Sequence, residues 1–91
     1  MQAKSMKVYV SVLAAFDREG RIYPRKIRWE DGQVYTVDRV YDVRPAPALK
    51  AGGQGDAYTI SVQGQRSRLF FERSTDPASA VIGRWFVERR G

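Results

Sequence analysis

The chain has 91 residues, the length of one domain, with 43% hydrophobic residues and a net charge of +6. It contains no cysteine and no histidine, which excludes disulfides, thiolate chemistry, zinc sites of the usual kind and imidazole acid–base catalysis. The apolar run at 8–16 is too short for a membrane span and lacks a cleavage pattern, so we expect a cytoplasmic protein that does not bind a membrane. We also expect no cofactor.

The first predicted strand covers residues 6–16. Apolar side chains occupy every second position, which is typical of a strand with one apolar face: Met6, Val8, Val10, Val12, Ala14 and Phe16. Residues 17–20, Asp-Arg-Glu-Gly, have the composition of a turn.

The second predicted strand covers residues 21–30. Ile27 and Trp29 share one face and are expected in the core. Pro24 has no backbone N–H and cannot donate to a ladder, which predicts an edge position or an irregular start.

The third predicted strand, residues 33–44, follows a tight turn at Glu30-Asp31-Gly32. Asp-Gly between alternating apolar residues is a strong hairpin signal, because the glycine takes a positive φ without steric cost. Val37 and Val40 are out of phase with each other. We therefore expect a β-bulge or a bend at Asp38-Arg39, a device by which small barrels turn a corner.

A long segment rich in glycine and proline, residues 45–56, is predicted to be irregular, and loops of this length are usually functional or mobile. Its glycines suggest a phosphate cradle, but that chemistry needs a following helix, and here a strand pattern follows. A flexible connection is the favoured interpretation. Lys50 remains a candidate contact for an external anion.

Three further strands are predicted at 57–63, 66–72 and 84–89, the first two joined by a tight turn at Gln63-Gly64-Gln65. Asp76-Pro77 predicts one short helical or 3₁₀ turn.

Together these elements predict a single all-β domain over residues 1–91, with fraying at 1–5 and 89–91. Five to six strands would form a small curved antiparallel sheet or partly open barrel, SH3-like or OB-like, with at most one helical turn.

No residues suggest catalysis. The acidic pairs, Glu30-Asp31 and Asp38 with Asp42, lie at a turn and along a strand, without the apolar surroundings that raise a carboxyl pKa towards neutrality. We therefore expect neither an enzyme nor a small-molecule substrate.

Two tryptophans, Trp29 and Trp85, each follow an arginine, as in stacking platforms for single-stranded nucleic acid. Both nevertheless lie in phase with core positions, Ile27 and Val87, which favours a structural role.

The candidate binding surface is a set of basic and aromatic residues. If odd-numbered Leu69, Phe71, Trp85 and Val87 point inward, Phe70 and Phe86 point outward beside arginines. The full set of candidates is Lys26, Arg28, Lys50, Arg66, Arg68, Phe70, Arg84 and Phe86.

Three interpretations of this surface stay open. An apolar patch rimmed by charge is typical of a protein partner or a homodimer. Arginines between aromatics on a sheet also suit single-stranded or duplex DNA or RNA, and the positive charge favours such partners. Internal packing on both faces is the third. We favour a non-enzymatic module for protein–protein interaction, with a nucleic-acid-binding accessory protein as the alternative.

The run 23–40, with Trp29, Gly32, Tyr35 and Val37, and the closing segment 84–88 resemble a family of small uncharacterised proteins from Gram-positive clostridia. The central hairpin and last strand also weakly resemble a short β domain found beside translesion DNA polymerases. The first resemblance implies no activity. The second implies accessory work in DNA metabolism and carries over no functional residue.

Overall fold

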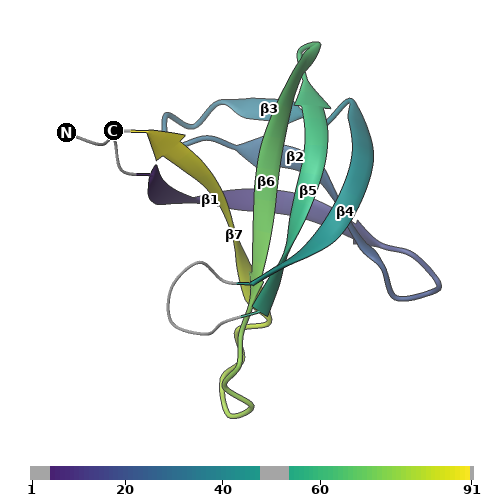
Figure 1. Ribbon diagram of the computed structural model, residues 1–91, viewed down its shortest axis with the longest axis vertical. Coiled ribbons are helices and arrows are strands. Elements are labelled where there is room, and N and C mark those ends of the chain that lie inside the picture. Colours follow the sequence, from purple (N-terminus) through teal and green to yellow (C-terminus); the bar gives the residue numbers. More distant parts are fainter. Residues whose placement is uncertain (1–4, 48–53, 91) are drawn as a thin grey trace.

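The structure, a computed structural model, describes residues 5–47 and 54–90 as one antiparallel sheet that curls into a half-barrel (Figure 1). The all-β class is confirmed, but the described residues form seven strands instead of the expected five to six. The strands are β1 (Ser5–Phe16), β2 (Ile22–Arg28), β3 (Val34–Thr36), β4 (Arg39–Pro47), β5 (Gln54–Val62), β6 (Gln65–Arg73) and β7 (Gly83–Arg90).

The strand order is β3-β2-β1-β7-β6-β5-β4. β1 links the two parts of the sheet, because residues 5–10 pair with β7 and residues 11–16 pair with β2. β3 and β4 are consecutive in the chain, yet they lie at opposite edges.

The short connection between β3 and β4 draws these two edges together. The Val37 amide donates to the Arg25 carbonyl of β2 at 2.9 Å, and the next amide, of Asp38, donates to the Ser61 carbonyl of β5 at 2.8 Å. The bend expected at Asp38-Arg39 is therefore present. It divides the segment predicted as one strand into two, and a bulge follows between Val40 and Asp42.

Pro24 lies at an irregularity of the sheet, as expected. The register between β1 and β2 shifts there, since Leu13 pairs with Lys26 and Ala14 pairs with Pro24. β3 pairs only with residues 26–28 of β2, so no ladder partner on that side needs an N–H from the proline.

Two turns have the geometry that their sequences predict. Gly32 has a φ of +87°. Gln63 and Gly64 are both left-handed, with φ of 52° and 77°, as a two-residue type I′ hairpin requires.

Two predicted irregular segments need correction. The segment 45–56 is shorter than expected as a loop, because β4 continues to Pro47 and β5 begins at Gln54. Around Asp76 the predicted helical or 3₁₀ turn is reduced to a single hydrogen-bonded turn, with no helical residue. The Ala78 amide donates to the aspartate side chain at 3.0 Å, as predicted for a cap, and the Ser79 amide donates to the Asp76 carbonyl at 3.1 Å. No helix in the described part of the chain is long and apolar enough to cross a membrane.

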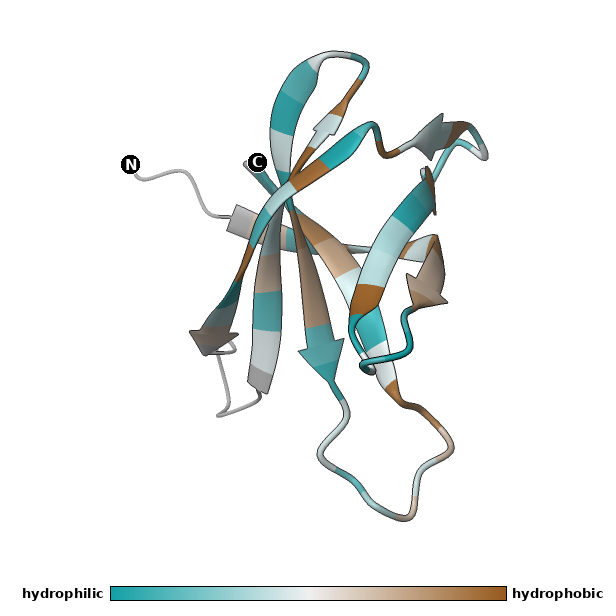
Figure 2. Cartoon of the chain, turned by 90° about the vertical axis from the view of Figure 1, so that its right-hand side faces the viewer, coloured by the Kyte–Doolittle hydropathy of each residue, from teal (hydrophilic) through white to brown (hydrophobic). Residues whose placement is uncertain are grey.

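The core fills the concave side of the sheet, and hydrophobic and hydrophilic residues alternate along the strands (Figure 2). The inward positions of Leu69, Phe71 and Trp85 are confirmed, and Val87 packs against them. The buried core comprises Ile27, Tyr58, Ile60, Leu69, Phe71 and Trp85. Trp29 differs from the prediction, because it is only half-buried and lies outside this cluster.

Candidate functional site

The outer face of β6 and β7 carries five of the predicted binding residues. Strand register places Arg66 opposite Ser61, Arg68 opposite Thr59, and Phe70 opposite Phe86. Side chains at alternate positions share a face, so Arg66, Arg68 and Phe70 point the same way. Arg84 lies two residues before Phe86 on the same side.

The two phenylalanines on this face are not exposed, which corrects the expectation of an apolar patch. Phe70 is 7% exposed and Phe86 is 4% exposed. Their rings stack with centroids 5.0 Å apart and planes 10° apart, so each shields the other. Tyr9 contacts Phe86 edge-on at 5.8 Å, and the Lys7 ammonium lies 4.7 Å from the Phe86 centroid. For these two rings, the third interpretation, internal packing, is therefore the one that holds.

Glu72 organises the charges beside that pair. Its carboxylate accepts a 2.7 Å hydrogen bond from Lys7 and lies 3.5 Å from the Arg84 guanidinium. The Lys7 hydrogen bond and the neighbouring positive charges hold the pKa of Glu72 below its ordinary value. Arg84 also lies 4.0 Å from the centroid of Tyr9. The charge of Arg84 is thus partly neutralised within the protein.

A second cluster on the outer face includes two residues that sequence analysis missed. Tyr41 of β4 is exposed, with the Arg66 guanidinium 4.1 Å and the Arg39 guanidinium 5.6 Å from its ring centroid. The Ser61 hydroxyl, and then Arg66 and Arg39, lower the pKa of Tyr41. Arg68 lies next along β6, over the Phe70 ring at 5.3 Å. We call Arg39, Tyr41, Arg66 and Arg68 the arginine–tyrosine patch.

The arginines of this patch keep their positive charge available. In the described part of the chain, no ion pair involves Arg39, Arg66 or Arg68. The bulge between Val40 and Asp42 inserts Tyr41 as an extra residue against β5, which is why a simple period-2 pattern did not predict its position.

The other predicted binding residues lie elsewhere. Lys26 and Arg28 are exposed on β2, opposite Thr36 and Val34, and β1 and β7 separate them from β6. Lys50 lies outside the described residues. Among the described members of the set, the structure brings together those on β6 and β7.

Trp29 lines a cavity of about 400 Å³ near the Gln63-Gly64 turn, together with Tyr35 and Arg66. Its ring centroid is 5.9 Å from the Arg89 guanidinium, which also pairs with Glu30. Arg66 thus belongs to the patch and also lines a cavity with two more aromatic side chains, Trp29 and Tyr35.

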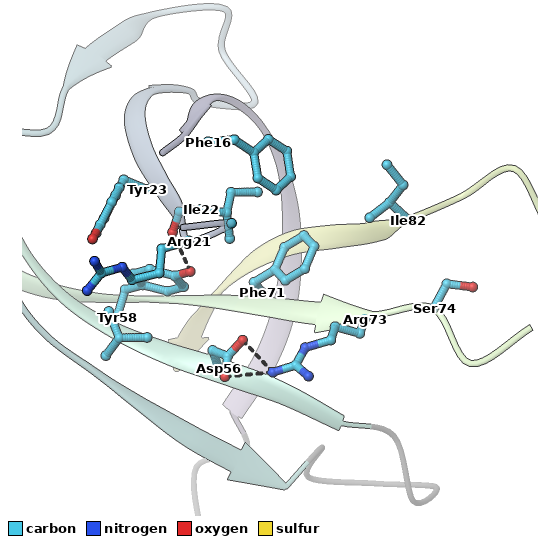
Figure 3. Close-up of a pocket in the computed structure, with 12 residues that line it drawn as sticks. Phe16, Arg21, Ile22, Tyr23, Asp56, Tyr58, Phe71, Arg73, Ser74 and Ile82 are labelled. Carbon is cyan, nitrogen blue, oxygen red and sulfur yellow. Dashed lines mark hydrogen bonds and ion pairs between the residues drawn. The ribbon is translucent and has the colours of Figure 1, made fainter. Parts of the chain in front are cut away.

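A larger cavity of about 610 Å³ opens at the other end of β5 and β6 (Figure 3). Tyr58 and Phe71 of the core line it, as do Phe16 and Ile82. The Tyr58 hydroxyl donates to the Ile22 carbonyl at 2.7 Å, and burial raises the pKa of Tyr58 to about 12. That hydroxyl therefore stays protonated at neutral pH.

Comparisons with protein-family models, with curated proteins and with solved structures find no match to this chain.

Proposed function

We propose that this chain is a non-enzymatic cytoplasmic binding module for single-stranded nucleic acid, with the arginine–tyrosine patch as its contact surface. The observation that carries the proposal is the exposed Tyr41 side chain close to two arginine guanidinium groups, neither of which has an ion-pair partner among the described residues. Single strands expose base faces, which stack on aromatic rings and guanidinium planes.

Charge supports the same choice of ligand. The net charge is +6, and Arg39, Arg66 and Arg68 occupy the outer faces of two strands on either side of β5. Neighbouring strands lie about 4.8 Å apart, so these three guanidinium groups cover a surface wide enough for several phosphates. The weak resemblance of the central hairpin and the last strand to a short β domain found beside translesion DNA polymerases would imply the same class of ligand.

The patch suits single strands better than a duplex. A duplex hides its base faces, so it would contact the arginines through phosphates alone and leave the Tyr41 stack unused. At the finer level of fold we favour an SH3-like over an OB-like barrel. Consecutive strands pair within β1–β3 and within β4–β7, whereas the OB fold is a Greek key.

Fluorescence anisotropy with labelled oligothymidylate and oligouridylate at low salt tests the proposal. We expect affinity to fall with salt at a slope of about −0.7 per phosphate contact, or about −2 for three arginines. Arg66→Gln and Arg68→Gln should each reduce the magnitude of the slope by about 0.7. Tyr41→Leu should weaken binding about 5-fold or more with the slope unchanged, since stacking on a base is lost.

Arg18→Gln is the matched control, because Arg18 lies on the β1–β2 turn with a side chain that is 92% exposed. It removes one positive charge away from the patch and should leave affinity and slope unchanged. No binding at micromolar protein in low salt would refute the proposal. Equal losses in Arg18→Gln and Arg66→Gln would show that net charge alone attracts the strand.

Binding of a protein partner, or formation of a homodimer, stays a prediction from the sequence. Its motivation was an outward apolar pair, and Phe70 and Phe86 are instead buried against each other. Light scattering after size exclusion tests it, and a dimer that Arg66→Gln leaves intact, in a protein that binds no oligonucleotide, would favour it over nucleic acid.

A further inference from the structure

The cavity at the mouth of the half-barrel has the size and lining of a small-molecule site. Its volume of about 610 Å³ lies within the range of about 300–1,000 Å³ found for ligand pockets, which often occur in the mouths of β-barrels. The apolar wall combines residues from five strands and the segment before β7: Phe16, Ile22, Val43, Tyr58, Phe71 and Ile82.

Three apolar side chains that line this cavity are exposed to solvent. Phe16 is 66% exposed and Ile82 is 74% exposed, and Val43 is exposed beside them. They come from three separate segments, yet all line the same cavity, and Figure 3 labels Phe16 and Ile82 among its lining residues together with Phe71. An apolar surface assembled in this way commonly marks a binding site.

One positive charge is held in place at the edge of the apolar cavity. Arg73, the last residue of β6, donates through Nη2 to both oxygens of Asp56, at 2.9 and 2.8 Å. The Asp56 side chain is 17% exposed and the Arg73 side chain is 50% exposed. Both bonds use Nη2 of Arg73. The other two guanidinium nitrogens, Nε and Nη1, make no hydrogen bond to any described residue.

We propose that this cavity binds a small carboxylic acid with an apolar body, its carboxylate on Arg73 and its body between Phe16, Phe71 and Ile82. The remaining N–H groups of the guanidinium suit a carboxylate, and such charge-assisted bonds are stronger than those between neutral groups. Tyr58 keeps its proton and adds no negative charge to the floor of the cavity. The Asp56 carboxylate also lines the cavity, but its charge is balanced by its own pairing with Arg73.

This site is separate from the arginine–tyrosine patch. Arg66 and Arg68 lie on the outer face of β6, whereas Phe71 and Arg73 line the cavity. The inference therefore does not depend on nucleic-acid binding, and each can fail alone.

Isothermal titration calorimetry with decanoate, and with decanol as the uncharged analogue, tests the proposal. We expect decanoate to bind about tenfold or more tightly than decanol, since only the acid uses Arg73. The double variant Arg73→Met with Asp56→Asn removes the guanidinium without leaving a bare carboxylate, and it keeps the net charge at +6. It should reduce decanoate binding to the level of decanol.

Ile82→Ser tests the apolar rim at a position too exposed to affect folding. The substitution should lower the affinity for decanoate and for decanol about three- to tenfold. Its matched control is Leu13→Ser, because Leu13 is exposed on the face of β1 opposite to Phe16. This control should change neither of the two affinities.

Any of four results would overturn the proposal. These are no binding of either ligand at about 1 mM, equal affinity for decanoate and decanol, and a preference for decanoate that survives in the double variant. The fourth is tighter binding of a peptide with an apolar residue before a free C-terminal carboxylate, which would make the occupant a polypeptide end.

Discussion

Replacing Phe86 by alanine tests the packing of the outer face. Its ring is 4% exposed, stacks on Phe70 at 5.0 Å and meets the edge of Tyr9 at 5.8 Å. Phe86→Ala removes one ring of the stack and exposes the other, so the cost includes both the lost burial and the lost aromatic contact.

The size of the effect follows from where this cluster lies. Truncating a buried phenylalanine costs about 3–5 kcal/mol, and aromatic pairs contribute about 0.5–1.5 kcal/mol beyond area. The pair is covered by Lys7 and Tyr9 rather than by a second sheet, so neighbouring side chains can close over part of the gap. We therefore expect about 3 kcal/mol, which lowers Tm by roughly 12–24 °C in a domain of this size.

Phe16→Ala is the matched control, since Phe16 is 66% exposed and should change stability by no more than about 0.5 kcal/mol. Urea unfolding of both variants, followed by circular dichroism with the m-value held in common, measures the difference. A cost for Phe86→Ala as small as that for Phe16→Ala would refute the packing described for the outer face, and the ring would then be accessible to a partner.

Three more outcomes are expected. Gly83→Ala should lower stability by about 1–3 kcal/mol in thermal unfolding, because a Cβ there would lie 2.5 Å from a ring carbon of Phe71; an unchanged Tm would contradict that close approach. Lys7 lowers the pKa of Glu72, so stability should be lost in urea unfolding as pH falls from 4.5 through the lowered pKa, and Glu72→Gln should flatten this dependence. Burial raises the pKa of Tyr58 from 10.0 to about 12, so the folded state loses stability as pH rises above 10.0, and Tyr58→Phe should remove that loss.

Side-chain parity was predictable from the sequence because strands impose a strict period of two. Leu69, Phe71 and Trp85 lie in the core as the alternation indicates. The positive φ of Gly32 and the tight turn at Gln63-Gly64 followed from residue type. These features depend on local stereochemistry, which the residue types of a single sequence determine.

Exposure was not predictable in the same way, because it depends on which strands become neighbours. Phe70 and Phe86 point away from the core as expected, but only the pairing of β6 with β7 brings the rings into contact. Cross-strand partners have Cβ atoms about 4.5–5.5 Å apart, close enough for two rings to bury each other on an outer face.

The arginine–tyrosine patch was missed for a related reason. Residues 33–44 read as one strand, whereas β3 and β4 join opposite edges of the sheet, and that division places Tyr41 beside Arg66. Local patterns rarely indicate that two consecutive short strands will separate to opposite edges of a sheet. The Asp38-Arg39 bend was the one sequence signal that pointed towards it.

Both proposed sites depend on the register of β6. Arg66 and Arg68 reach the outer patch, and Phe71 and Arg73 reach the cavity, because alternate residues of one strand face opposite ways. A slip of one residue against β5 would exchange the two sets and destroy both sites together. The Gln63-Gly64 turn opposes such a slip, since a type I′ hairpin requires positive φ at both central residues and so fixes which residues of β5 and β6 face each other.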